Sequence, residues 1–323
     1  MSQNRNFDAH LSGAGDDRAL LAAVARAFYL DDKSQVEIAN ELEISRFKVA
    51  RLLTRARDEG VVSITINDRG LPDTALAARL GAALGIRSCH VVRSHGDEDA
   101  VREQIGATAA TLLSDTLAPD EVLGVTWGRT LLATTSQLVH VPRISIVQLT
   151  GVVAGDISSS PIEVARQVSR RSGGRVYPIF SPLYVQDRET AVGLRSHPDI
   201  GAAMELFPKV TTAVLSVGAW DPPDSQIKDV LPIDALANAI AGGCVADIAG
   251  ILLKEDGTPV DPTFEERCVN ISLDQLKRIP RVIAVAGGSA KADAIRAVAR
   301  GGLISELVTD HALAEAVLTG MDA

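Results

Sequence analysis

The sequence predicts an α/β protein in two parts: a winged helix-turn-helix domain at residues 1–66 and a larger domain at residues 75–323. Three observations support this prediction. Short segments with helical periodicity occupy most of residues 17–59. A polar stretch with glycine and proline, NDRGLPDT at residues 67–74, is typical of a linker. Beyond it, apolar runs of strand length alternate with helical segments, which favours a doubly wound, mostly parallel sheet.

The composition is that of a soluble globular protein, with 46% hydrophobic and 23% charged residues. The three cysteines, Cys89, Cys244 and Cys268, form no CxxC pair, which indicates a reducing compartment. The histidines show no metal-ligand spacing. The N-terminus lacks the apolar stretch of a signal peptide, and no apolar run approaches the ~20 residues of a membrane span. We expect a cytoplasmic protein without metal or membrane association.

Charge is distributed unevenly along the chain, whose formal net charge is −9. Residues 1–66 hold nine Lys and Arg against ten Asp and Glu, whereas the remainder holds 23 against 31. Within the first part, residues 45–57 carry five basic side chains and no carboxylate. Because the acidic remainder would repel a polyanion, this basic stripe is the expected nucleic-acid surface.

The first domain begins with a helical pattern in DDRALLAAVARAFYLDD. In the next segment Ser34 and Glu37 have capping-box spacing, and Val36, Ala39 and Leu42 are expected to form the apolar face. Ser45 can cap a third helix over residues 46–59, which ends at a glycine. The alternating segment VVSITI then predicts the short strand of a wing.

Three short helices with a tight turn before the third form a helix-turn-helix, whose third helix enters the major groove of DNA. Arg46 and Lys48 lie where base edges are reached, and Phe47 can touch a thymine methyl. Arg51 and Arg55 are placed to hold phosphates. The alternative is a solvated charged face on a surface helix. The predicted DNA-binding residues are Ser45, Arg46, Phe47, Lys48, Arg51 and Arg55.

The larger domain alternates strands and helices in chain order. The predicted helices are residues 74–84, 97–117, 129–138, 160–173, 289–302 and 310–318. The predicted strands are residues 88–94, 121–128, 144–151, 175–180, 211–220 and 281–288. In such sheets, ligands bind outside the carboxyl ends of the strands.

Two strand ends have the composition of an anion- or sugar-binding turn. In GVTWGRT, Gly124 and Gly128 permit close backbone approach, Thr126 and Thr130 offer hydroxyls, and a helix begins near Arg129. In AVAGGSAKADAI, Gly287 and Gly288 form the turn and Lys291 adds a positive charge. Neither turn has a nucleotide-binding signature, so no cofactor is expected. Asp221 and Asp247 are candidate partners for sugar hydroxyls. Ordinary turns, loop residues and helix caps are the alternative for all of these positions.

These segments resemble the sugar-binding transcriptional regulators of the SorC type, from about residue 17 to residue 320. QVEIANELEISRFKVARLL resembles the DNA-reading segment of that family, and GVTWGRT, QLTG, ADIAGILLKEDGTPVD and AVAGGSAKADAIRAVARGGLISELVTDHALAEAVL resemble its effector domain. The resemblance implies a fold like that of phosphosugar isomerases, reused as a sensor. It also implies a phosphorylated sugar or polyol effector, bacterial operator DNA as partner, and a homotetramer or dimer.

Carried over by position, the GVTWGRT loop and Lys291 would contact the effector, and Asp247 lies in the matching acidic stretch. Phe47 stands where such helices often have proline. The third predicted strand carries Gln148 and Thr150 and no lysine or arginine, whereas some relatives place a basic residue there. Thr150 is therefore a candidate contact, and an unphosphorylated polyol remains open as the effector.

Two functions fit these patterns. The first is a regulator whose operator affinity depends on a bound sugar, sugar phosphate or polyol, with repression and activation both open. The second is a sugar-phosphate isomerase or aldolase-like enzyme with an added helical module. Such chemistry needs an acid/base pair or an imine-forming lysine. Lys291 is the one lysine at a predicted site, and no histidine–carboxylate motif accompanies it. We therefore predict a regulator and not an enzyme.

Overall fold

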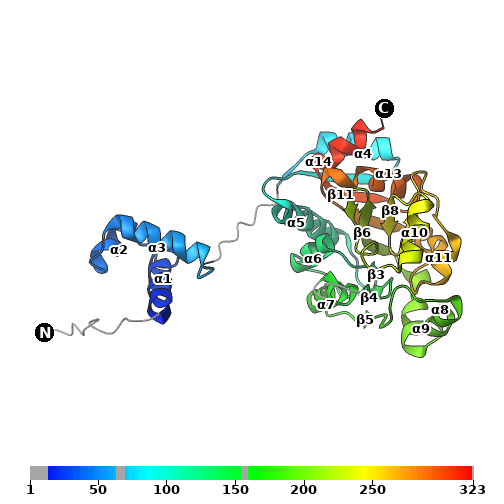
Figure 1. Cartoon of the computed structure of the whole chain (residues 1–323), viewed down its shortest axis with the longest axis horizontal. Coiled ribbons are helices and arrows are strands. Elements are labelled where there is room, and N and C mark those ends of the chain that lie inside the picture. Colours follow the sequence, from blue (N-terminus) through cyan, green and yellow to red (C-terminus); the bar gives the residue numbers. More distant parts are fainter. Residues whose placement is uncertain (1–13, 63–69, 154–158, 322–323) are drawn as a thin grey trace. The chain divides into compact units, whose positions relative to one another are not determined.

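The computed structural model describes residues 14–62, 70–153 and 159–321. The chain divides into two compact units between Asn67 and Asp68 (Figure 1), and each unit has its own hydrophobic core. Within the described ranges, none of the helices combines the length and the apolar character that a membrane crossing requires.

The smaller unit contains helices α1 (Ala14–Tyr29), α2 (Gln35–Glu41) and α3 (Arg46–Asp58). Both α1 and α2 pack against α3. The shared core consists of Leu21, Val24, Ala25, Ile38, Ala39, Val49, Leu52, Leu53 and Ala56. The predicted helix-turn-helix arrangement is confirmed, whereas residues 63–66 of the predicted wing lie outside the described residues.

The predicted caps fix the turns between these helices. The Ser34 hydroxyl accepts from the Glu37 amide, and the Glu37 carboxylate accepts from the Ser34 amide at 2.8 Å. The Ser45 hydroxyl accepts from the Lys48 amide at 3.2 Å. Gly60, with φ of 66°, follows the last turn of α3 in the left-handed conformation that glycine adopts readily. The ends of α2 and α3 are therefore determined locally by the residues beside them.

The predicted apolar face of α2 is wrong in part. Ala39 is buried, but Val36 and Leu42 are 51% and 40% exposed. Ile38 occupies the core instead, with 1% of its surface exposed. Since α2 is only two turns long, its orientation against α1 and α3 decides which adjacent residues are covered, and periodicity alone does not.

The larger unit is built on a sheet with strand order β1-β2-β11-β10-β6-β3-β4-β5. The strands from β2 to β5 in that order are parallel, and β1 joins β2 antiparallel. Their bounds are β1 (Leu71–Pro72), β2 (Ser88–Arg93), β3 (Val122–Val125), β4 (Ser145–Gln148), β5 (Val176–Tyr177), β6 (Thr212–Trp220), β10 (Arg281–Val285) and β11 (Glu306–Asp310). The mostly parallel α/β sheet is as predicted.

Helices cover both faces of this sheet. Successive residues of β6 point to opposite cores: Leu215 packs with α4, α13 and α14, whereas Val214 packs with α5, α6 and α7. The α-helical bounds are α4 (Thr74–Leu84), α5 (Glu98–Thr116), α6 (Arg129–Ser136), α7 (Pro161–Ser172), α8 (Arg188–Arg195), α9 (Pro198–Met204), α10 (Ile233–Ala241), α11 (Pro262–Glu266), α12 (Leu273–Lys277), α13 (Ala292–Arg300) and α14 (His311–Thr319). Short 3-10 helices η2 (Phe207–Lys209) and η3 (Ser289–Lys291) complete the unit.

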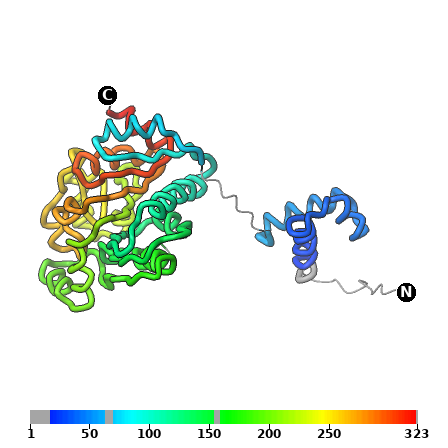
Figure 2. The backbone as a smooth tube through the Cα atoms, turned by 180° about the vertical axis from the view of Figure 1, so that it is seen from behind, coloured from blue at the N-terminus to red at the C-terminus, as the bar shows by residue number. Residues whose placement is uncertain are grey.

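The chain direction across the sheet reverses between β3 and β6. From β3 the chain proceeds to β4 and β5, returns to β6 on the other side of β3, and continues through β10 to β11. The carboxyl ends of β3 and β6 therefore border a topological switch point, where α/β proteins bind ligands. Figure 2 shows the beginning of the unit, in cyan, beside its end, in red; there β2 pairs with β11.

The carboxyl end of β6 continues into an antiparallel extension that was not predicted. It consists of β7 (Pro223–Asp224), β8 (Ala246–Ile248) and β9 (Ile251–Leu253). A separate apolar cluster that includes Trp127 and Trp220 packs around it. The extension raises a wall beyond the carboxyl edge of the parallel sheet, and it carries Asp224 and Asp247.

The predicted linker, residues 67–74, is too long at its carboxyl end. Leu71–Pro72 pairs with β2, and the Asp73 carboxylate caps α4 by accepting from the Leu76 amide at 3.0 Å. Asp73 is also 2.9 Å from the Arg93 guanidinium. These contacts place residues 71–74 in the larger unit, because the short strand finds its partner only in the folded sheet.

Leu215→Ala is expected to destabilise the larger unit by about 2–5 kcal/mol, since it leaves a cavity at a fully buried position of the central strand. Urea unfolding followed by the transition of that unit measures the change. Val139→Ala, at a position 79% exposed, is the control and should change stability by about 0.5 kcal/mol or less. Equal effects of the two substitutions would contradict the assigned core.

Candidate functional site

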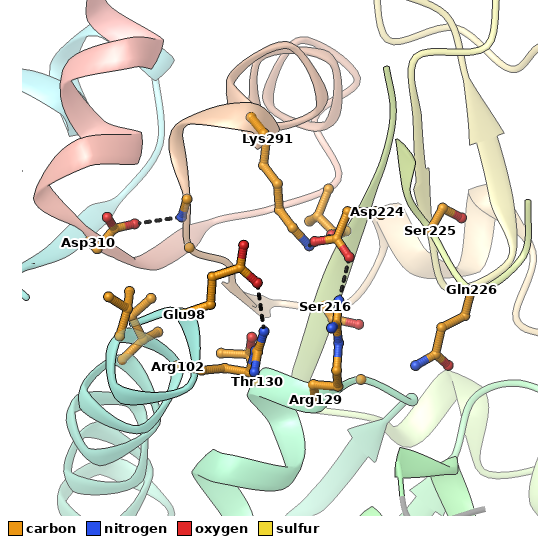
Figure 3. A pocket seen from close by; sticks show the side chains of 18 of the residues that line it. Glu98, Arg102, Arg129, Thr130, Ser216, Asp224, Ser225, Gln226, Lys291 and Asp310 are labelled. Carbon is orange, nitrogen blue, oxygen red and sulfur yellow. Dashed lines mark hydrogen bonds and ion pairs between the residues drawn. The ribbon is translucent and has the colours of Figure 1, made fainter. Parts of the chain in front are cut away.

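A cavity of about 690 Å³ lies at the carboxyl ends of β3, β6, β10 and β11. It is closed on one side by the start of α5 and on the other by the antiparallel extension (Figure 3). The lining that matters for ligand chemistry is Glu98, Arg102, Thr126, Gly128, Arg129, Thr130, Ser216, Gly218, Asp224, Ser225, Gln226, Asp247, Gly287, Gly288, Ser289, Lys291 and Asp310. Most of these side chains are polar.

The first predicted turn forms the floor of the cavity. Gly128 has φ of 145°, and a Cβ atom there would lie 2.5 Å from the Ser216 Oγ atom. The Ser216 hydroxyl donates to the Trp127 carbonyl at 2.5 Å. The turn that follows β3 therefore lies in close contact with β6. Helix α6 starts at this turn, beside the cavity; it has eight residues and no side-chain cap, so its first backbone amides have no partner within the helix.

The second predicted turn lies on the neighbouring strand. A Cβ atom on Gly287 would lie 2.3 Å from Ile105, whereas Gly288, with φ of 88°, faces open space. The Gly288 amide donates to the Asp310 carboxylate at 2.9 Å. Gly287 is therefore required for packing against α5, and Gly288 for the backbone conformation that turns the chain into η3.

One carboxylate joins the cations of the two turns. Asp224 Oδ1 lies 2.5 Å from Arg129 Nη2, and its Oδ2 lies 3.2 Å from Lys291 Nζ. Lys291 Nζ also donates to the Val217 carbonyl at 2.7 Å. In Figure 3, Arg129 and Lys291 approach Asp224 from opposite sides. Since the three residues come from α6, η3 and β7, only the folded chain brings them together.

A buried carboxylate lies behind this group. Asp247 is 3% exposed, and its Oδ2 accepts from Trp220 Nε1 at 3.0 Å and from the Ser225 hydroxyl. Burial raises its pKa, although the two hydrogen bonds and the charge of Lys291 act in the opposite direction. Gly218 permits the close contact, because a Cβ atom there would lie 2.3 Å from Asp247 Oδ2.

The rim at α5 carries a second ion pair. Glu98 Oε2 lies 3.5 Å from Arg102 Nη2, and Arg102 also contacts Asp99. Glu98 is largely exposed while Arg102 is 17% exposed, so the guanidinium is the more enclosed partner. Together with Gln226, which donates to the Ser159 hydroxyl at 3.2 Å, these groups give the cavity donors and acceptors on several sides.

The structure brings together most of the predicted effector residues. Those that line the cavity are Thr126, Gly128, Arg129, Thr130, Asp247, Gly287, Gly288 and Lys291. Gly124, Thr150 and Asp221 do not. Gly124 lies inside β3, where a Cβ atom would be 2.8 Å from Leu149. Thr150 is fully buried beside Asn270. The β6–β7 register pairs Trp220 with Pro223, so Asp221 is in the exposed turn between the strands.

Asp224, Ser216, Asp310 and the Glu98–Arg102 pair also line the cavity and were not predicted from the sequence. Asp310 ends a strand and caps the following helix, accepting from the Ala312 amide at 3.2 Å, which is a signal the sequence contains. Asp224 carries no comparable signal. It reaches the cavity because β7 folds back along β6, and that pairing is decided by tertiary structure.

The basic stripe on α3 is solvent-exposed. Arg46, Phe47, Lys48 and Arg51 are all exposed, with Phe47 at 81%, and among the described residues the three cations make no ion pair. Arg55 differs, because its guanidinium lies 3.1 Å from Asp17 and 2.8 Å from Glu59. Two carboxylates from outside the stripe therefore occupy one of the predicted phosphate contacts.

Comparison with known proteins assigns the chain to a family. A sequence model described as "Putative sugar-binding domain" matches residues 70–319. The chain is also 30% identical, over 318 residues, to the transcriptional regulator LsrR of Klebsiella pneumoniae, which covers 94% of this chain and 93% of that protein. The chain belongs to the SorC-type family of sugar-binding transcriptional regulators. The relatives support a sugar-controlled DNA-binding regulator rather than an isomerase.

Further relatives of this SorC-type regulator agree over nearly the whole chain. The uncharacterized transcriptional regulator YjhU of Escherichia coli is 28% identical over 300 residues, covering 90% of this chain and 92% of that protein. The crystal structure of the full-length sorbitol operon regulator SorC from Klebsiella pneumoniae matches with a TM-score of 0.71 and 22% identity. That match covers 94% of this chain and 99% of the SorC chain, and it concerns the fold.

The raised pKa of Asp247 makes a prediction about stability and pH. A carboxyl whose folded pKa exceeds its unfolded value of about 3.9 contributes stability below that value, and the contribution is lost as pH rises through the folded pKa. Asp247→Asn removes this titration. The difference in Tm, variant minus wild type, should therefore increase as pH rises above about 4. Asp221→Asn, in the exposed turn, is the control; a constant difference for Asp247→Asn would contradict the prediction.

The ion pairs of Arg55 predict unequal roles along α3 of this SorC-type regulator. Arg51→Ala is expected to weaken binding to all DNA sequences and to reduce the salt slope by about one unit. Arg55→Ala should have the smaller effect, because its guanidinium is shared with Asp17 and Glu59. Fluorescence anisotropy with operator and unrelated duplexes at several salt concentrations measures both. A larger loss for Arg55→Ala would show that the DNA displaces these carboxylates.

Proposed function

We propose that the cavity binds a sugar, sugar phosphate or polyol effector and that its occupancy controls the affinity of α3 for operator DNA. The observation that carries this proposal is the convergence of hydroxyl, carboxylate, amide and cationic side chains on one cavity at the switch point of the sheet. Polyhydroxylated ligands need such alternating donors and acceptors. The glycine turns add backbone amides without side chains in the way.

DNA contact is assigned to Ser45, Arg46, Phe47, Lys48 and Arg51 on the exposed face of the smaller unit. Arg46 and Lys48 lie in the first turn of α3, which is the part of a recognition helix that reaches base edges. The family assignment supports this role, since the relatives are transcriptional regulators. We therefore also propose that the protein acts in the cytoplasm, where bacterial operator DNA is found.

Coupling between the two units is proposed to run through an oligomer, a homotetramer or dimer. An effector shifts such an assembly only by its differential affinity for two subunit arrangements. Symmetric half-sites separated by multiples of about 10 base pairs would match a two-fold arrangement of recognition helices. Sedimentation with and without effector distinguishes a change of assembly from a change within one assembly.

The proposed role is sensing and not catalysis. The cavity lining described here contains neither histidine nor cysteine, and Lys291 is held by Asp224 and the Val217 carbonyl. An imine-forming lysine would need to be released from this ion pair and deprotonated. Turnover of sugar phosphates by the purified protein would favour the isomerase-like alternative.

Thermal unfolding against matched pairs of free and phosphorylated sugars and polyols tests the proposed function. A ligand that binds only the folded state stabilises it by about 2.7 kcal/mol at a hundredfold excess over its Kd. The stabilising ligand should then change operator affinity in the anisotropy assay. Gly288→Val, which places a branched side chain at the open turn, should abolish the shift. A ligand that stabilises the protein without affecting DNA binding would contradict the proposal.

A further inference from the structure

We propose that Asp224 is a specificity-determining residue: its carboxylate occupies the anion-binding groups of the cavity, so that a phosphorylated ligand binds only by displacing it. This inference rests on the proposed function and adds a rule about which ligands the cavity accepts. It concerns a residue that lies outside both glycine turns and that reaches the cavity through the β6–β7 pairing.

The geometry is that of a carboxylate standing where a phosphate group would stand. Each oxygen of Asp224 faces a different cation, Arg129 at 2.5 Å and Lys291 at 3.2 Å. Arg129 is the first residue of α6 and Lys291 the last residue of η3, so these cations extend from the segments that follow β3 and β10. A phosphoryl group at the same place would face the same two cations.

The two cations differ in freedom, which determines what displacement involves. Lys291 is 14% exposed and also donates to the Val217 carbonyl, so its position is set by β6. Arg129 is 52% exposed and Asp224 is 39% exposed, so both of these side chains can swing toward solvent. The neighbouring Ser225 and Ile227 are buried, and the backbone of this segment can stay in place. Displacement can therefore take place by rotation of the Asp224 side chain, without movement of the backbone.

This arrangement sorts ligands by charge. A neutral sugar or polyol can bind with Asp224 in place and use its carboxylate as a hydroxyl acceptor. An anionic ligand meets a negative charge at the point where its own charge is best stabilised, and it must break two ion pairs before it gains two new ones. Asp224 thus lowers affinity for phosphorylated ligands relative to free ones.

The test uses the full-length protein with inorganic phosphate as the probe, at constant ionic strength maintained with sodium chloride. Asp224→Asn keeps the size of the side chain and releases Arg129 and Lys291. Binding of phosphate, measured by calorimetry and by the rise in Tm, should tighten on the order of tenfold, which is about 1.4 kcal/mol at 25 °C. Adding Arg129→Gln to Asp224→Asn should remove most of this gain.

Two controls separate this effect from a general change of charge. Asp221→Asn makes the same charge change three residues earlier, in the exposed turn, and should leave phosphate affinity unchanged. Glu98→Gln removes a carboxylate from the cavity rim that pairs with Arg102 and with neither Arg129 nor Lys291. It should give less than half of the gain in binding free energy seen with Asp224→Asn.

Equal gains from Asp224→Asn and either control would overturn the inference, because the effect would then be one of net charge. Absence of phosphate binding to both wild type and Asp224→Asn would also overturn it, since the released cations would not form an anion site. Neither result bears on the sugar panel, whose own failure would instead contradict the proposed function. The two proposals can therefore fail separately.

Discussion

The close contact between the end of β3 and the side of β6 sets the position of the groups in the cavity. Gly128 can approach Ser216 because it lacks a Cβ atom, and the Ser216 hydroxyl then holds the Trp127 carbonyl. This contact directs the start of α6, and with it Arg129, toward the extension of β6. A Cβ atom at Gly128 would lie 2.5 Å from Ser216 Oγ, so any larger residue there would require a shift at the switch point.

The position of Arg129 also decides which charges meet in the cavity. The cavity gathers cations from two turns, and Asp224 and Asp247 from the extension supply the compensating carboxylates. Desolvation of charged groups is costly, so enclosed cations such as Lys291 need a partner when no ligand is present. Because its charges are already paired, the cavity favours ligands that form hydrogen bonds with these groups. In the proposal above, discrimination between neutral and anionic ligands depends on the Asp224 carboxylate, which pairs with both cations.

The two units divide the electrostatic tasks of a regulator. The smaller unit places its basic residues on the exposed side of α3, where phosphates and base edges would be met. The larger unit is acidic, which disfavours nonspecific contact between it and DNA. The pairing of Arg55 with Asp17 and Glu59 shows that even within the stripe some positive charge is already satisfied by the protein itself.

Local patterns in the sequence determined the parts whose causes are local. The caps at Ser34 and Ser45, the alternation of strands and helices, the basic stripe and the glycine turns with Lys291 all depend on residues close together in the chain. Tertiary structure decided the rest. Ile38 replaced Val36 in the core because a short helix is oriented by its neighbours. Asp224 entered the cavity and Asp221 did not, because the β6–β7 register fixes which of the two faces inward, and strand pairing is a long-range contact that composition and periodicity do not specify.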